Sequence, residues 1–274
     1  MNIRSTIKMS NNVEIPTIGL GVWRVEDENE MRDSVKAALD TGYWHIDTAS
    51  AYQNEGMVGG AVADFAKRED IFITTKLWNT DHENAKEAFE ESLKKLKTDY
   101  VDLYLIHWPS PIHNKYVGAW KALVDIYNSG KAKAIGVSNF SISRIEEIID
   151  ATGFVPHMNQ VERHPFYQQN ELADYCASKG IIMTAYSPLG SDRFAEIVEK
   201  VKPLADKHGK TAAQIILRWH LQTGWVFIPK SVKPNRVAEN ADIFNFKLDM
   251  ADMSFMASLD TGVKFLPDPE TAQF

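Results

Sequence analysis

The sequence contains little cysteine, no excess of basic residues and no long apolar run. Its single cysteine, Cys176, cannot form an internal disulfide, which indicates a reducing compartment, and its helix-like surroundings favour a buried thiol over a reactive one. The 30 Lys and Arg residues are outnumbered by 37 Asp and Glu, giving a net charge of -7 without any basic block. Nucleic acid and membrane surfaces are therefore not expected as partners.

No stretch approaches the roughly 18 apolar residues that a membrane span needs, and residues 1–10 lack the apolar segment of a signal peptide. These absences indicate a cytoplasmic protein. The 274 residues, of which 44% are hydrophobic, suffice for one large core. No linker, low-complexity tract or sequence repeat divides them, so we expect a single domain over residues 1–274. Because no long exposed apolar seam is evident, we also expect a monomer.

The spacing of apolar residues predicts the fold. A β-hairpin at 5–9 and 13–16 comes first, around Asn11-Asn12, because asparagine tolerates the positive φ of a tight turn. Short runs that are apolar on both faces then alternate with amphipathic helices, which is typical of a parallel sheet covered on all sides. Eight runs predict a closed (β/α)8 TIM barrel of the α/β class, with an appended C-terminal helix at 251–259. The runs lie at 18–21, 43–47, 71–76, 102–107, 134–138, 157–161, 181–186 and 226–229.

Polar residues at the ends of these runs are the candidates for chemistry, because active sites of such barrels lie where the carboxyl ends of the strands meet. The second run ends in Asp47 and the third in Lys76. Since a buried charge needs a partner, we expect an ion pair, which could also serve only to fill the barrel. Tyr52, five residues after Asp47, and His107, at the end of the fourth run, favour a functional site because both are expected at the same mouth.

These four residues together suit carbonyl chemistry. A phenol has a pKa of about 10, and we expect the Lys76 ammonium to lower the pKa of Tyr52 and make it a better proton donor. His107 can hydrogen-bond a substrate oxygen and orient it. No serine or cysteine lies in a motif typical of a nucleophile, so a diffusible hydride donor is expected to supply the missing reactant.

The usual dinucleotide fingerprint is absent, because Gly19-Leu20-Gly21-Val22-Trp23-Arg24 does not satisfy G-x-G-x-x-G. The later strand ends offer another solution. Asn139 and Gln160 carry amides that suit a carboxamide, and Tyr186 offers a ring face for stacking.

A phosphate site is expected after the last strand, where barrels frequently build one from loops and a helix N-terminus. Ile228-Pro229-Lys230-Ser231 runs into a helix that carries Arg236, Glu239 and Asn240. Lys230 and Arg236 together suit a 2′-phosphate, whereas either alone is typical of a solvated surface.

Motifs in order along nearly the whole chain resemble those of the aldo-keto reductases. They are Gly19-Leu20-Gly21-Val22-Trp23, Asp47-Thr48-Ala49 with Tyr52 and Asn54-Glu55, Thr75-Lys76-Leu77-Trp78, Leu105-Ile106-His107-Trp108-Pro109, Gly136-Val137-Ser138-Asn139-Phe140, Asn159-Gln160, Tyr186-Ser187-Pro188-Leu189-Gly190, and Ile228-Pro229-Lys230-Ser231 with Arg236 and Glu239-Asn240. The resemblance implies NADPH-dependent reduction of aldehydes and ketones to alcohols. It implies a catalytic tetrad of Asp47, Tyr52, Lys76 and His107, with Tyr52 as the general acid.

The resemblance also assigns the cofactor contacts. Ser138, Asn139 and Gln160 are implied to bind the carboxamide, and Tyr186 to stack on the nicotinamide. The other implied contacts are Gly21, Val22, Trp23, Asp47, Ser187, Leu189, Lys230, Ser231, Val232, Arg236, Glu239 and Asn240.

The loops that usually select the substrate are short here. The segment at 109–118 is brief, the loop after Tyr186 is brief, and the chain ends soon after Phe265 instead of in a long loop over the mouth. The sequence is similar to the short prokaryotic-type branch, with 2,5-diketo-D-gluconate reductases and glyoxal or aldehyde reductases. We therefore expect a weak belt over the cofactor and an open pocket that accepts simple aldehydes, keto-sugars or α-dicarbonyls. Tyr52 and His107 are expected to line this pocket, with Trp23, Trp78 and Trp108 as its walls or as ordinary packing.

Three other functions fit parts of the pattern. His45 and Asp47 on one strand face, with Lys76 and His107 on the next strands, form part of the ligand set of a metal-dependent barrel hydrolase, but the set is incomplete and no metal is expected. Lys76 could form a Schiff base in a lyase. A non-catalytic NADPH-sensing subunit is also conceivable, although the intact Tyr52 argues against it.

Overall fold

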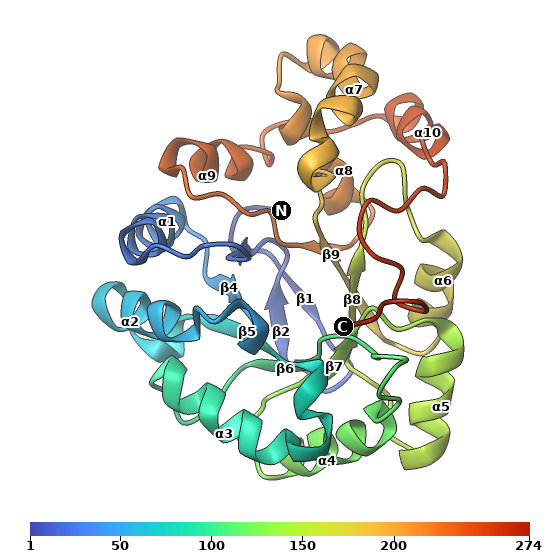
Figure 1. The fold of residues 1–274 in the computed structure, drawn as a ribbon. Coiled ribbons are helices and arrows are strands. Elements are labelled where there is room, and N and C mark those ends of the chain that lie inside the picture. The colour runs from blue at the N-terminus through green and yellow to red at the C-terminus, as the bar shows by residue number, and fades with distance from the viewer.

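The computed structural model describes residues 1–274 and contains a barrel of parallel strands surrounded by helices (Figure 1). Each barrel strand pairs with the next one along the chain, and two isolated parallel bridges, from Ile18 to Phe227 and from Gly21 to Lys230, close the sheet. The predicted TIM barrel is confirmed. The strands are β3 Leu20–Gly21, β4 His45–Asp47, β5 Phe72–Leu77, β6 Leu103–Ile106, β7 Ile135–Ser138, β8 Met158–Glu162, β9 Ile182–Tyr186 and β10 Val226–Phe227.

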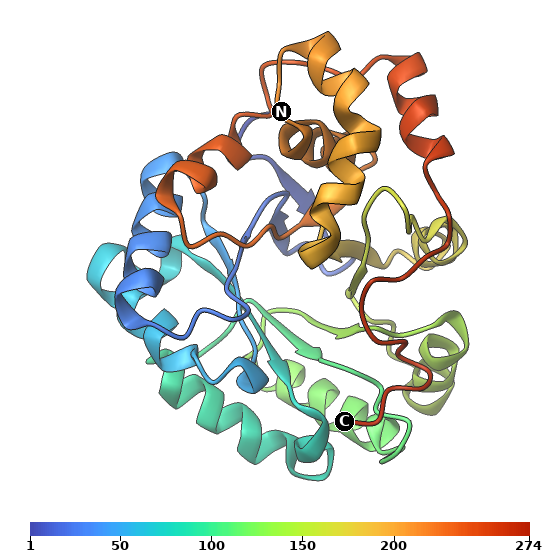
Figure 2. The ribbon, with the colours of Figure 1, turned by 45° about the horizontal axis from the view of Figure 1, so that its top comes forward.

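The helices form the outer ring (Figure 2). Helix α1 begins after Asp27, whose side chain accepts a hydrogen bond from the Glu30 N–H, and ends at Gly42 with a φ of 103°. None of the helices is both long and apolar enough to cross a membrane. The helices are α1 Glu28–Thr41, α2 Glu55–Phe65, α3 Ala85–Leu96, α4 Tyr116–Asn128, α5 Ile142–Thr152, α6 Asn170–Ser178, α7 Phe194–His208, α8 Ala212–Gln222, α9 Pro234–Ala241 and α10 Met250–Ser258.

The predicted hairpin covers the amino-terminal end of the barrel. Strands β1 Thr6–Lys8 and β2 Glu14–Pro16 pair in antiparallel fashion, and Asn12 has the expected positive φ of 70°. Ile15 is buried in one cluster with residues at the beginnings of the barrel strands, such as Phe72. The opposite end of the barrel is therefore the one left for a site.

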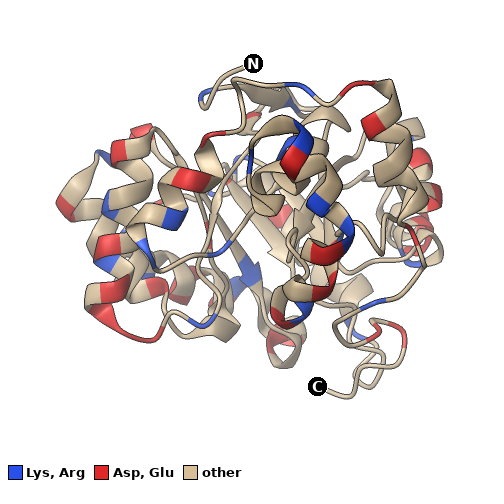
Figure 3. Cartoon of the chain, turned by 90° about the horizontal axis from the view of Figure 1, so that it is seen from above, with Lys and Arg blue, Asp and Glu red and all other residues tan.

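The main core fills the space between the sheet and the ring of helices. It includes outward-facing residues such as Ile46 and Val137, and Cys176 is buried among them. Burial raises the pKa of the Cys176 thiol to about 12, so the buried reading of this cysteine is confirmed. Charged residues of both signs are spread over the outer helices without forming a face of one sign (Figure 3).

The tail, residues 259–274, is extended and follows the predicted appended helix, which is α10 in the structure. It runs from α10 along the side of the barrel formed by α6 and α5 and ends at the mouth (Figures 1 and 2). Glu162 at the end of β8 accepts the N–H of Phe265 at 2.7 Å, and Arg144 on α5 pairs with Glu270 at 2.8 Å. The sequence indicated only that no long loop covers the mouth, and it did not predict that these two anchors hold a short tail across it.

Candidate active site

The predicted ion pair lies inside the barrel. Lys76 on β5 donates from Nζ to Asp47 Oδ1 at 2.5 Å and to the Thr48 carbonyl at 2.8 Å. Both charged residues are essentially inaccessible to solvent, with exposures of 1% for Asp47 and 0% for Lys76. Burial lowers the pKa of Lys76 and raises the pKa of Asp47, and the attraction between the two groups opposes both shifts. Each residue therefore depends on the other to stay charged.

Tyr52 and His107 face this pair. Tyr52 lies in the 3-10 turn Ser50–Tyr52 after β4, and Lys76 Nζ is 5.2 Å from the centroid of its ring. The ring of His107, which follows β6, packs edge to face against Tyr52 with 5.5 Å between centroids. The structure thus brings all four predicted tetrad residues together at one rim of the barrel.

The pKa of Tyr52 moves in the direction opposite to our prediction. Burial raises it well above its usual value, and the nearby negative charge of Asp47 raises it further. The predicted lowering of the Tyr52 pKa is wrong for this structure because desolvation by burial is the largest influence on it. Tyr52 is therefore firmly protonated, which keeps a proton in place for donation.

His107 is a neutral imidazole. Burial and the positive charge of Lys76 hold its pKa well below the usual range. A neutral ring carries one N–H that can donate to a ligand oxygen. Its backbone carbonyl accepts a hydrogen bond from Asn139 Nδ2 at 3.0 Å, which fixes the end of β6 to the end of β7.

The residues assigned to the nicotinamide end adjoin the tetrad. Gln160 Nε2 donates to Asp47 Oδ2 at 2.8 Å, and the Tyr186 hydroxyl donates to Asn139 Oδ1 at 2.6 Å. Ser138 Oγ accepts from Asn139 Nδ2 at 3.2 Å. The ends of β7, β8 and β9 therefore form one hydrogen-bonded surface beside Asp47.

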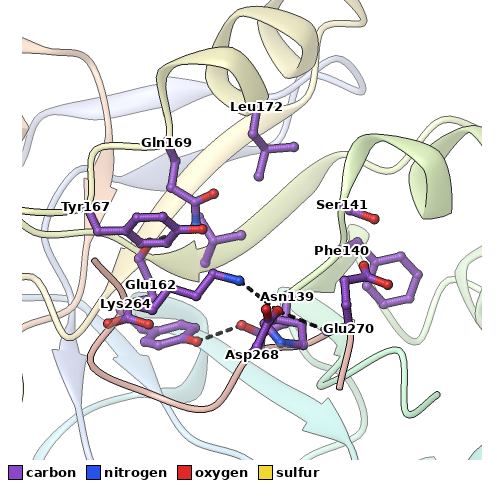
Figure 4. Close-up of a pocket in the computed structure, with 13 residues that line it drawn as sticks. Asn139, Phe140, Ser141, Glu162, Tyr167, Gln169, Leu172, Lys264, Asp268 and Glu270 are labelled. Atoms are coloured by element: carbon purple, nitrogen blue, oxygen red, sulfur yellow. Dashed lines mark hydrogen bonds and ion pairs between the residues drawn. The ribbon is translucent and has the colours of Figure 1, made fainter. Parts of the chain in front are cut away.

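A smaller cavity, of about 80 Å³, lies between this surface and the tail (Figure 4). Asn139 and Tyr186 line this cavity together with Lys264, Asp268 and Glu270 of the tail. The tail therefore encloses part of a cavity that Tyr186 also lines.

A groove extends from the loop after Tyr186, at Ser187, to α9. Its volume is about 630 Å³. All of the late-chain contacts implied beyond Tyr186 line it, namely Ser187, Leu189, Lys230, Ser231, Val232, Arg236, Glu239 and Asn240. The prediction did not include Lys233, Phe194 and Thr211, which also line the groove. Lys233 could have been predicted because it follows Lys230 and Ser231 closely in the sequence. No sequence feature indicates that Phe194 and Thr211, at the starts of α7 and α8, lie at this groove.

Gly21, Val22 and Trp23 have different environments. A Cβ at Gly21 would lie 2.9 Å from the Ile228 carbonyl, so close strand packing requires glycine there. Val22 is buried and its N–H donates to the Asp47 carbonyl, which leaves its side chain in the core. Trp23 is partly exposed, with the Arg24 guanidinium 4.2 Å from its ring centroid. Of the three, Trp23 presents a side chain to solvent.

The belt over the groove is slight, as expected. Arg24, after β3, approaches Asp192, after β9, at 3.7 Å, and both side chains are more than half exposed. An exposed pair of this kind contributes little to stability.

Aromatic residues wall the tetrad on the other side. The ring of Trp78 lies 5.3 Å from that of His107, and Phe274 stacks on Trp78 at 5.8 Å and meets Trp108 edge to face at 5.0 Å. Asn79 Nδ2 donates to the Phe274 carbonyl at 2.7 Å. Phe274 and Asn79 were not predicted as site residues. The only sequence feature that could have indicated Phe274 is that it is an aromatic residue in the tail.

The metal-hydrolase alternative is not supported. His45 Nε2 bonds to Thr74 Oγ1 at 3.0 Å, and burial lowers the pKa of His45 to about 3. No group of three or more His, Cys, Asp or Glu side chains converges as a metal site would require.

Comparison with known proteins gives the family. Residues 17–261 match the Aldo/keto reductase family. The chain is 46% identical to methylglyoxal reductase DkgA of Escherichia coli, covering 97% of each protein, and 46% identical to glyoxal reductase of Bacillus subtilis, covering 100% of this chain and 99% of the relative. Among solved structures, a mutant of Gox0644 in complex with NADPH has 42% identity, covers 99% of each chain and superposes with a TM-score of 0.93. With this agreement of sequence, fold and site, the chain belongs to the aldo/keto reductase family.

Proposed function

We propose that the protein reduces aldehydes and ketones to alcohols with NADPH, and that Tyr52 is the general acid. The observation that carries the proposal is the buried Asp47 and Lys76 pair beneath Tyr52, with the neutral ring of His107 on the same rim. A related protein in complex with NADPH supports the choice of cofactor. When bound, NADPH supplies the hydride.

The chain has groups that fit this cofactor. Lys230, Lys233 and Arg236 line the groove and form no ion pair within the protein, so they are free for a phosphate. Gln160 Nε2 is bound to Asp47, which leaves Oε1 as an acceptor for a carboxamide N–H. The ring of Tyr186 offers the stacking face.

The protein's own part in the reaction is to hold and deliver a proton. The raised pKa of Tyr52 keeps its hydroxyl protonated until negative charge develops on the substrate oxygen. His107 donates its N–H to the same oxygen and orients it. Lys76, held by Asp47, stabilises the phenolate that remains after the proton has left. Burial strengthens these interactions because water is excluded.

Small carbonyl compounds are the proposed substrates, with α-dicarbonyls first. Relatives named methylglyoxal reductase and glyoxal reductase support this class, and keto-sugars stay within the proposal. Trp23, Trp78 and Trp108 are proposed as walls of the pocket. We further propose that the chain acts as a single-domain, cytoplasmic monomer, for which light scattering after gel filtration gives the oligomeric state.

The direct test follows NADPH absorbance with a panel of simple aldehydes, α-dicarbonyls and keto-sugars. We expect turnover with several of them. Tyr52→Phe should lower kcat by at least ~10²-fold, the scale of a lost general acid, while NADPH still quenches tryptophan fluorescence. Normal turnover in this variant would contradict the role of Tyr52, and no turnover by the wild type would contradict the proposed activity.

A further inference from the structure

Gln160 connects two parts of the site that the proposed function treats separately. Its side chain is 2% exposed at the mouth of the barrel, on β8. Its Nε2 reaches across to Asp47 Oδ2 on β4, a residue 113 positions away in the chain, at 2.8 Å. A residue assigned to the cofactor is therefore in direct contact with a tetrad carboxylate.

This contact completes the coordination of Asp47. One carboxylate oxygen accepts from Lys76 Nζ and the other accepts from Gln160 Nε2. An ionised carboxylate cannot donate, so Gln160 must direct its NH2 group toward Asp47. Its Oε1 receives no hydrogen bond from the protein and is the end left for a ligand. Asp47 thus determines which end of the amide faces the cofactor.

We propose that Gln160 is a positioning residue of the tetrad as well as a cofactor contact, because its amide fixes the carboxylate of Asp47 and links recognition of the carboxamide to the Asp47 and Lys76 pair. The inference rests on the proposed function, which supplies the carboxamide. Without Gln160, Asp47 would keep Lys76 as its partner but would lose the donor on its second oxygen. A buried carboxylate with one oxygen that accepts no hydrogen bond binds a proton more readily.

Other titratable and charged groups near Asp47 could also contribute to a measured pH dependence. Lys76 of β5 bears the positive charge in contact with it, and Tyr52 of the 3-10 turn lies close enough to feel its negative charge. His107 after β6 is influenced by Lys76 and stays neutral. Glu55, bound to Thr75 on β5, acts on Lys76 from a greater distance. Loss of the Gln160 hydrogen bond therefore acts first on Asp47.

The test compares Gln160→Met and Gln160→Glu with Ser138→Ala. Ser138 is assigned to the same carboxamide but makes no hydrogen bond to Asp47, so it is the matched control. Gln160 lowers the pKa of Asp47 by donating to its charged form, so Gln160→Met should move the acid limb of the kcat profile to higher pH, by about one unit. Gln160→Glu should move it further, since two adjacent carboxylates cannot both ionise easily. Ser138→Ala should weaken NADPH binding with the midpoint of the acid limb unchanged.

A second measurement does not depend on activity. The Asp47 carboxyl carbon can be titrated by NMR in the cofactor-free protein with labelled aspartate, and assigned with Asp47→Asn. We expect the Asp47 titration to move to higher pH in both Gln160 variants, and further in Gln160→Glu than in Gln160→Met, with circular dichroism confirming that both fold. If they bind NADPH less tightly but titrate like the wild type, Gln160 serves the cofactor alone and the inference is overturned. Absence of carbonyl reduction in the wild type would instead overturn the proposed function, while the NMR titration would still decide the link to Asp47.

Discussion

The tetrad and the end of the groove proposed to bind a phosphate are built in opposite ways. Asp47 and Lys76 are sealed from solvent, and their polar atoms bond to partners within the protein. Lys230 and Arg236 line an open groove of about 630 Å³ and form no ion pairs. The tetrad is therefore preorganised before any ligand binds. The basic residues of the groove, in contrast, have no partner within the protein and can pair with a ligand.

This difference follows from what each region must do. Groups that stabilise developing charge are most effective when water is excluded and when they need not reorganise during the reaction. A phosphate site must stay hydrated and accessible so that a charged ligand can enter and leave. Changes in the tetrad should therefore alter turnover, and changes in the groove should alter affinity.

The largest expected effect tests the sealed region. Lys76→Met should lower kcat by about 10³-fold, because the charge that stabilises the Tyr52 phenolate is lost. The unpaired Asp47 should also reduce the free energy of unfolding by roughly 3–5 kcal/mol at neutral pH, measured by urea denaturation. The double variant Asp47→Asn with Lys76→Met, which removes the unpaired charge, should recover stability without recovering turnover. A single variant with unchanged kcat would contradict the proposed role of Lys76.

An intermediate effect tests the open region. Lys230→Ala combined with Arg236→Ala should weaken NADPH binding by about 10- to 100-fold, because the charge-assisted hydrogen bonds to a 2′-phosphate are lost. NADH lacks that phosphate, so its affinity should change little. Fluorescence titration with both cofactors measures the difference, and Lys202→Ala on the exposed face of α7 serves as the control. Equal losses for NADPH and NADH would refute a 2′-phosphate site.

The smallest effect tests the tail, which covers the sealed region. Phe274→Ala removes one face of the contact with Trp78 and Trp108, and we expect a change in KM of about 2- to 10-fold for aromatic aldehydes. The kcat for a two-carbon dialdehyde should stay within about 2-fold, since the tetrad is unchanged. Phe65→Ala on α2, an exposed phenylalanine away from the mouth, is the control. Identical KM values across the panel would show that Phe274 does not line the pocket.

The sequence predicted the features that depend on local patterns. The alternation of apolar runs with helices predicted the barrel, and the last polar residue of each run predicted Asp47, Lys76 and His107 at the mouth. The hairpin was predictable because Asn12 adopts the positive φ that asparagine tolerates. These signals extend over only a few residues, so no tertiary contact is needed to detect them.

The remaining features depend on contacts between distant residues. Asn79 and Phe274 are 195 positions apart, and no periodicity in the tail indicates that it reaches the mouth. The bond from Gln160 to Asp47 likewise crosses the barrel. The pKa of Tyr52 was predicted in the wrong direction because burial, which the sequence does not give, outweighs the nearby ammonium. These features depend on long-range packing, so local sequence patterns could not predict them.

The hairpin at the amino-terminal end has a consequence for how this molecule can change. With Ile15 and Phe72 packed together at that end, reactants enter and products leave from one side only. The residues that keep the barrel folded are therefore largely separate from the loops that meet the substrate. New substrate preferences can arise at the mouth, by exchange of loop residues and of the last few residues of the chain. The hairpin that closes the opposite end of the barrel can stay the same.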